Sequence, residues 1–96
     1  MMVQNDISIE IQEQALIINL RDIPHEDIKQ KWLHDYLANW QLTIHEYEIN
    51  ADYHQASFYY NDVLYFVTMC DLTKSMWINA THNSASSLDD LYKYIS

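Results

Sequence analysis

Hydrophobic and polar residues follow two periods along this chain, one typical of strands and one typical of helices. Ile7, Ile9 and Ile11 alternate with polar residues, which predicts a strand over 7–11 with one buried face. The segment ALIINL predicts a second strand over 15–20, and the short polar interval between the two predicts a hairpin.

Residues 24–39 are predicted to form an amphipathic helix, because apolar side chains recur at spacings of three and four. These side chains are Ile28, Trp32, Leu33, Tyr36, Leu37 and Trp40. Pro24 is expected in the first helical turn, where its missing N–H costs nothing. Glu26 and Asp27 are expected there too, because the helix dipole favours negative charge.

The buried face switches within the next predicted strand, which ends at Ile49. Leu42 and Ile44 are at even positions, whereas Tyr47 and Ile49 are at odd ones, so the two pairs would face opposite sides of a regular strand. A β-bulge near His45 and Glu46 would produce this switch, and a strand that begins only at Thr43 is the alternative.

Three more strands are predicted over 55–60, 63–70 and 76–80. Asn61 and Asp62 are predicted to form a two-residue hairpin turn, since Asn and Asp adopt left-handed conformations more readily than most residues. The segment VLYFVTMC, residues 63–70, is nearly all apolar and predicts a central strand covered on both faces.

A short helix is predicted near the C-terminus. Ser87 and Asp90 form a variant of the capping box, and apolar residues follow at helical spacing through Ile95. Residues 1–5 and 81–86 are expected to be flexible.

The element order ββαββββα predicts one α+β domain over residues 1–96. Its sheet is expected to be antiparallel, with the last four strands forming a meander and both helices packed mainly on one face. No stretch carries a motif specific enough to name a family.

The amino-acid composition argues against several classes of function. The chain of 96 residues contains no glycine, so it has none of the glycine-rich loops that cradle phosphates or dinucleotides. Its net charge of −9 disfavours binding to nucleic acid or to a membrane surface. The same charge fits a basic protein partner, or serves only to keep an apolar-rich domain soluble.

Cysteine use and the N-terminal residues favour a cytoplasmic protein. A single cysteine, Cys70, can form neither an internal disulfide nor a structural zinc site. The first ten residues are polar and acidic, unlike a secretory signal, and the apolar run 63–67 is far too short to span a membrane.

Candidate catalytic residues have simpler structural explanations. His45 and His54 lie on neighbouring predicted strands and could come together, but no histidine has a metal-ligand spacing along a helix. Cys70 is better explained as a small buried apolar residue than as a nucleophile. We therefore expect no catalytic residue, metal or cofactor.

Paired carboxylates raise the hypothesis of an acid and a base flanking a scissile bond. Asp89 and Asp90 are explained by the start of a helix, and Glu46 and Glu48 by a solvated sheet edge or face.

Three aromatic residues, Tyr59, Tyr65 and Trp77, have the parity opposite to the more regularly apolar one in their strands. If the helices cover only one face of the sheet, these rings form an exposed patch of the kind that marks an interface. Cover by the N-terminal hairpin or by the second helix is the alternative. The candidate interaction surface therefore comprises Tyr59, Tyr65, Trp77, Glu46 and Glu48.

Two classes of function follow. The first is a non-enzymatic protein-interaction module that resembles an inhibitor, an immunity protein or a chaperone in action, or that self-associates as a homodimer. The second is a small-molecule binding domain or modest enzyme with a pocket between helix and sheet that uses His45, His54 or Cys70.

Overall fold

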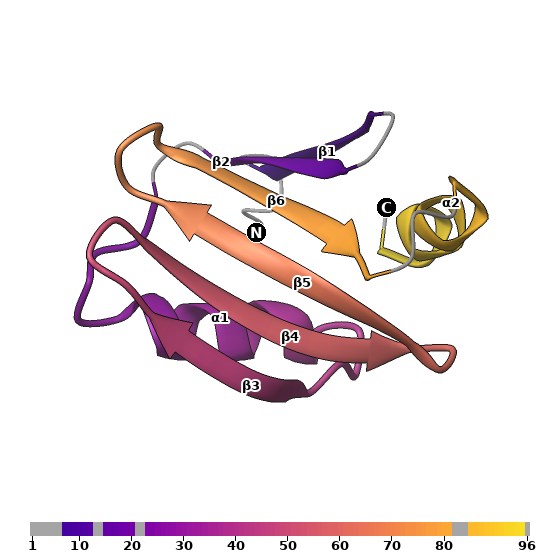
Figure 1. Ribbon diagram of the computed structural model, residues 1–96, viewed down its shortest axis with the longest axis horizontal. Coiled ribbons are helices and arrows are strands. Elements are labelled where there is room, and N and C mark those ends of the chain that lie inside the picture. Colours follow the sequence, from indigo (N-terminus) through magenta and orange to yellow (C-terminus); the bar gives the residue numbers. More distant parts are fainter. Residues whose placement is uncertain (1–6, 13–14, 21–22, 82–84, 96) are drawn as a thin grey trace.

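Six antiparallel strands form one sheet in the order β1-β2-β6-β5-β4-β3 (Figure 1). The computed structural model describes residues 7–12, 15–20, 23–81 and 85–95. The elements are β1 (Ile7–Ile11), β2 (Leu16–Leu20), α1 (Lys29–Ala38), β3 (Ile44–Ile49), β4 (Tyr53–Tyr60), β5 (Val63–Cys70), β6 (Ser75–Ala80) and α2 (Ala85–Ile95). The predicted α+β class, the element order and the meander of the last four strands are confirmed.

The switch of buried face in β3 has the predicted cause. Ile44 pairs with Phe58 and Glu46 pairs with Ser57, so His45 is one extra residue between two consecutive partners in β4. This β-bulge lets Ile44 and Tyr47 both pack against the core although their parities differ. The strand begins at Ile44, one residue after the alternative start that the pattern allowed.

The first helix is shorter than predicted. It begins at Lys29, whereas residues 23–25 have no regular secondary structure and residues 26–28 form a turn. The first helical hydrogen bond joins the Trp32 N–H to the Ile28 carbonyl over 2.8 Å. Pro24 and Glu26 are therefore outside the helix, because this segment makes contacts with other elements that compete with helix formation.

The second helix begins earlier than predicted. Ser87 lies inside the first turn of α2 and is not its N-cap, since the helix starts at Ala85. Of the segments expected to be flexible, residues 1–5 and 82–84 lie outside the described residues. No helix in the described part of the chain is long and apolar enough to cross a membrane.

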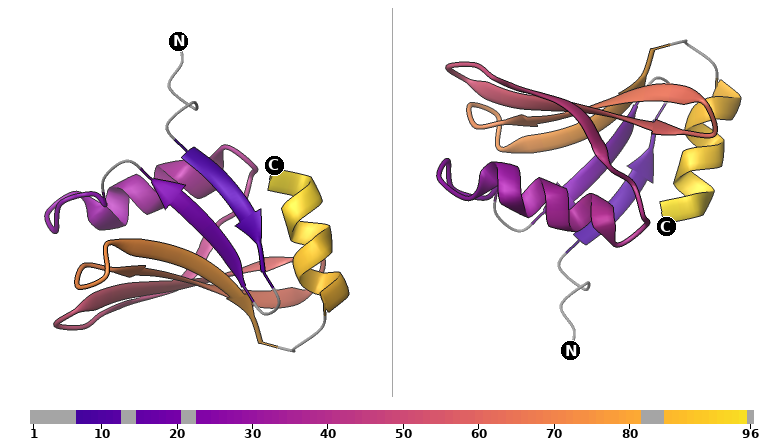
Figure 2. Two further views of the ribbon diagram at one scale, coloured as in Figure 1. Left: turned by 90° about the horizontal axis from the view of Figure 1, so that it is seen from above. Right: turned by 90° about the horizontal axis from the view of Figure 1, so that it is seen from below.

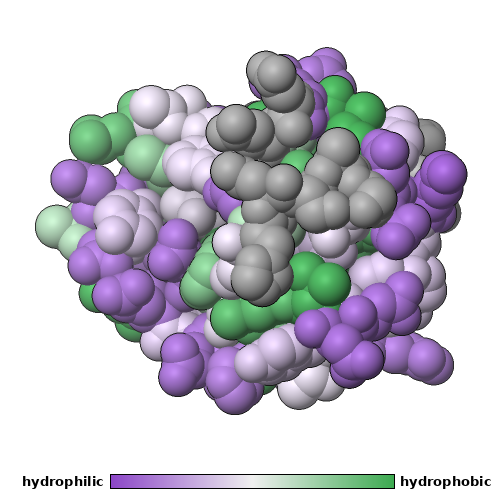
Figure 3. All heavy atoms as spheres, turned by 45° about the vertical axis from the view of Figure 1, so that its right-hand side comes forward, coloured by the Kyte–Doolittle hydropathy of each residue, from purple (hydrophilic) through white to green (hydrophobic). Residues whose placement is uncertain are grey.

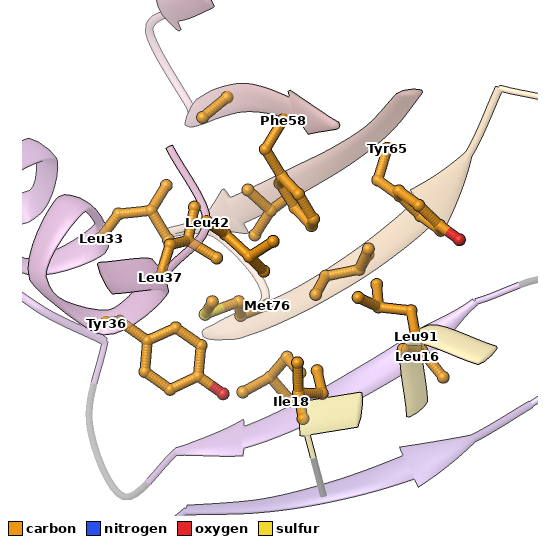
Figure 4. Close-up of a cluster of buried hydrophobic side chains, with 14 of the residues drawn as sticks. Leu16, Ile18, Leu33, Tyr36, Leu37, Leu42, Phe58, Tyr65, Met76 and Leu91 are labelled. Carbon is orange, nitrogen blue, oxygen red and sulfur yellow. The ribbon is translucent and has the colours of Figure 1, made fainter. Parts of the chain in front are cut away.

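Both helices pack on one face of the sheet, which we call the inner face, and enclose one hydrophobic core (Figures 2 and 4). Leu33 and Leu37 of α1 and Leu91 of α2 belong to this core. The sheet contributes Leu16, Ile18, Ala56, Phe58, Tyr65, Val67, Met69, Met76 and Ile78. Apolar burial of this kind is the main favourable contribution to folding.

Four non-glycine residues in the described ranges have a positive φ: Gln41, Asn61, Asp62 and Lys74. Asn61 and Asp62, with φ of 52° and 65°, confirm the predicted hairpin turn. Gln41 occupies the position after α1 where glycine is usual, since the Leu42 N–H bonds the Leu37 carbonyl in a Schellman arrangement.

Replacing Gln41 by glycine is expected to raise the free energy of unfolding by about 0.5–1 kcal/mol, because glycine adopts a positive φ without the steric penalty of a Cβ. Ala38→Gly, at the last residue of the helix, is the control and should lower the free energy of unfolding by up to about 1 kcal/mol. Urea denaturation followed by circular dichroism measures both, and destabilisation by Gln41→Gly would contradict the assignment of strain.

Two buried tyrosines are expected to respond oppositely to loss of the hydroxyl. The Tyr36 hydroxyl is buried without a hydrogen-bond partner, and burial raises its pKa to about 12, whereas the Tyr65 hydroxyl donates to the Ser87 carbonyl over 2.7 Å. Tyr36→Phe should therefore stabilise the protein by about 1 kcal/mol, and Tyr65→Phe should destabilise it by about as much. Thermal and urea denaturation of the two variants, side by side, check the opposite signs.

Candidate functional site

The opposite side of the sheet, which we call the outer face, is left open by both helices. Strand pairing aligns Glu46, Ser57, Phe66 and Asn79 in one row across β3, β4, β5 and β6. A second row crosses all six strands and consists of Glu48, Gln55, Thr68, Trp77, Ile17 and Glu10. Tyr59 and Leu64 form a shorter third pair. The outer face is therefore a mixed surface of carboxylates, small polar side chains and aromatic rings.

No described element covers the outer face of β3–β6, because α1 and α2 both lie mainly on the inner face (Figure 2). Strand β5 is nevertheless buried or half-buried on both faces, since Thr68 on its outer face is 5% exposed, and the predicted cover of the outer face comes from neighbouring side chains and not from a helix. Phe66 and Leu64 are half-buried there. An oblique view shows apolar side chains scattered among hydrophilic ones on the molecular surface (Figure 3).

The structure places four of the five predicted surface residues on this face. Tyr59 is 52% exposed and Trp77 is half-buried. Glu46 and Glu48 are exposed on β3, an edge strand of the sheet.

Tyr65 was expected on the same surface, and that expectation is wrong. Its ring is 1% exposed and stacks on Phe58 within the core. Both parities of β5 are apolar, so the pattern alone could not assign its inner face. The register resolves it, because Tyr65 pairs with Phe58, whose ring is buried.

A shallow hollow lies on the outer face where β3, β4 and β5 meet. Its volume is about 490 Å³, and the outward-pointing side chains that line it are those of Glu46, Glu48, Gln55, Ser57 and Phe66. Ser57 is 3% exposed, and its hydroxyl has no hydrogen-bond partner. A buried hydroxyl without a partner is unfavourable and is uncommon in folded proteins.

Negative charge on this face is not balanced locally. None of the six strands contains Lys or Arg, and their only charged residues are Glu10, Glu46 and Glu48. In the described part of the chain, neither Glu46 nor Glu48 makes an ion pair or a side-chain hydrogen bond. The two carboxylates are therefore free to interact with a cation from outside the chain.

The inner side of β3 is anchored by a hydrogen-bonded chain that runs through the buried side chain of His54 to the exposed carboxylate of Glu26. The Tyr47 hydroxyl lies 2.5 Å from Nδ1 of His54, and Nε2 of His54 lies 2.6 Å from a carboxylate oxygen of Glu26. Burial raises the pKa of Tyr47 to about 12, with a smaller contribution from the charge of Glu26. With Tyr47 donating to Nδ1, the His54 tautomer that carries its proton on Nε2 satisfies both contacts. These contacts connect the edge strand to the segment before α1.

A buried lysine lies at the start of α1. Lys29 is fully buried, and its ammonium group donates to the Pro24 carbonyl and to Asp71, each over 2.8 Å. The hydrogen bond from Lys29 lowers the pKa of Asp71 below its ordinary value. Paired in this way, the lysine carries its charge inside the protein.

Sequence reasoning missed both inner contacts, although signals existed. Lys29 lies four residues before Leu33, on the apolar stripe of the helix, and His54 shares the apolar parity of Ala56 and Phe58. A polar residue on an apolar stripe predicts a buried partner without naming it.

The residues of the enzyme hypothesis do not converge. His45 is exposed at the bulge and contacts the ring of Tyr59, whereas His54 is buried on the inner face. Cys70 is half-buried at the end of β5, where the side-chain hydrogen bond with Thr73 lowers its pKa. Within the described ranges, no histidine contacts Cys70, and no three of the His, Cys, Asp and Glu side chains group as a metal site would require.

Comparison with known proteins connects the chain to one family. A family model described as "Protein of unknown function (DUF3630)" matches residues 5–96. Neither the search of curated proteins nor that of solved structures found a match.

The Lys29–Asp71 pair yields a test of stability. Asp71→Asn should lower the free energy of unfolding by about 1–2 kcal/mol, less than for a fully buried pair because Asp71 is partly exposed. Since the folded pKa of Asp71 lies below the unfolded value of about 4, its contribution is complete above that value and is lost as the pH falls through the folded one. The variant should therefore lose less stability than the wild type between about pH 7 and about pH 2. Urea denaturation at both pH values measures the difference, and equal losses would contradict it.

Proposed function

The chain belongs to the DUF3630 family of proteins of unknown function, and we propose that it is a small non-enzymatic module that binds a basic protein through the outer face of its sheet. One observation carries this proposal: the outer face combines the exposed ring of Tyr59 with half-buried Trp77 and Phe66, and no described element covers it. Aromatic residues are enriched at protein interfaces because they provide large apolar areas with few rotatable bonds.

Charge favours a basic partner over a second copy of the chain. Glu46 and Glu48 lie on this face without a compensating cation in the strands, and the whole chain carries a net charge of −9. A symmetric dimer through the outer face would bring these carboxylates close to their own copies, and like charges at an interface are unfavourable. A basic partner instead gains from the same field.

The chemistry of the inner face supports binding over catalysis. His54 is buried between Tyr47 and Glu26, and Lys29 is buried between Pro24 and Asp71, so these groups are occupied in holding the fold. The hollow described above lies on the outer face, away from the interval between helix and sheet where the alternative small-molecule pocket was expected.

Binding of this kind fits a protein that acts by covering another. An inhibitor or immunity-like protein that blocks a basic enzyme is one version, and an acidic chaperone is another. A cytoplasmic location is part of the proposal and is supported by the use of a single cysteine.

The test compares what variants capture from a lysate of the source organism. Tyr59→Glu should abolish capture of the specific partner, because it replaces an exposed aromatic ring of the outer face with a charge. Leu72→Glu is the matched control, since Leu72 is 73% exposed in the turn between β5 and β6 and lies away from Tyr59. The captured proteins are identified by mass spectrometry. The Leu72→Glu control should capture the same partner as the wild type, and high salt should release that partner from both.

Identical captured proteins for the wild type and Tyr59→Glu would contradict the proposal. Sedimentation velocity of the purified chain tests self-association separately. A dimer that Tyr59→Glu dissociates would replace the basic partner with a second copy.

A further inference from the structure

We propose that the hollow lined by Glu46, Glu48 and Ser57 is a receptor for an arginine side chain of the partner protein. This inference rests on the proposed function and specifies the chemistry of its partner. It is carried by three independent features of the hollow: uncompensated carboxylates, a buried hydroxyl without a partner, and an aromatic ring.

The carboxylates set the charge and the spacing. Glu46 and Glu48 are two residues apart on one face of β3, so their Cβ atoms lie about 7 Å apart. A planar guanidinium has donors on both of its edges and can bond to two such groups at once. Neither carboxylate has another ionic partner in the described chain, so an incoming arginine displaces no existing contact.

Ser57 supplies the observation that points to a ligand. It lies between Glu46 and Phe66 in one row, at the floor of the hollow, and its hydroxyl makes no hydrogen bond. Because a buried hydroxyl without a partner costs free energy, the fold itself does not account for a serine here. A guanidinium N–H donated to its oxygen would satisfy it.

Phe66 favours arginine over lysine. Its half-buried ring forms one side of the hollow. The planar, weakly hydrated guanidinium stacks on an aromatic face, whereas the ammonium group of lysine is compact and strongly hydrated. A ring beside two carboxylates is therefore expected to bind the arginine side chain more tightly than the lysine side chain.

The test is an NMR titration with a hexa-arginine peptide at about 150 mM salt, which screens long-range attraction. Amide shifts should concentrate at Glu46, Ser57 and Phe66, and hexa-lysine should bind at least about threefold more weakly. Glu46→Gln/Glu48→Gln should weaken hexa-arginine binding about tenfold. The matched control, Glu10→Gln/Asp89→Asn, removes the same number of exposed charges elsewhere and should change affinity less than about twofold.

Ser57→Ala separates a binding role from a structural one. It should weaken hexa-arginine binding about threefold while leaving the protein at least as stable, because it removes a hydroxyl without a partner. Affinity equal to that of the wild type, or an equal loss in the charge control, would overturn the inference.

These outcomes can be distinguished from failure of the proposed function. If Tyr59→Glu abolishes partner capture while hexa-arginine and hexa-lysine bind alike, the outer face is an interface but the hollow is not an arginine receptor. If Tyr59→Glu leaves capture unchanged, the proposed function itself fails.

Discussion

Burial of one sheet face under two helices is the constraint on which the rest of the structure depends. The two helices and the sheet share a single core, which extends from Leu33 and Leu37 in α1 to Leu91 in α2. Both helices pack on that side, so no described element covers the outer face of β3–β6. The surface assigned to partner binding is thus a direct consequence of how the core is closed.

Alternate residues of β3 point to opposite faces of the sheet and make different contacts there. Tyr47 points inward and is joined through His54 to Glu26, which connects the edge strand to the segment before α1. Glu46 and Glu48 point outward, where they line the hollow. Because side chains alternate along a strand, an anchor on one face fixes the position of the two carboxylates on the other. The bulge at His45 sets this alternation, since it moves every later residue of β3 by one position.

Much of the fold could be predicted from local patterns, and the errors arise where contacts between elements decide the outcome. The strands, the bulge and the Asn61-Asp62 turn were predictable because each leaves a recognisable pattern in consecutive residues. The start of α1 was predicted too early, because contacts of Lys29 with Pro24 and Asp71 hold residues outside the helix. Tyr65 was assigned to the wrong face because both parities of its strand are apolar, so that local pattern carried no information about which one is buried.

By itself, the sequence determined the helices and strands, their order and the acidic charge, since period and composition are local properties. It also placed aromatic rings on the side of the strands whose residues are less regularly apolar. Only the tertiary structure decided which face the helices cover and which residues meet in one row. Glu46, Ser57 and Phe66 become neighbours through strand pairing, although they are separated by up to twenty positions along the chain. Register is a long-range property of backbone hydrogen bonding and core packing, and for that reason the hollow has no signature in the sequence.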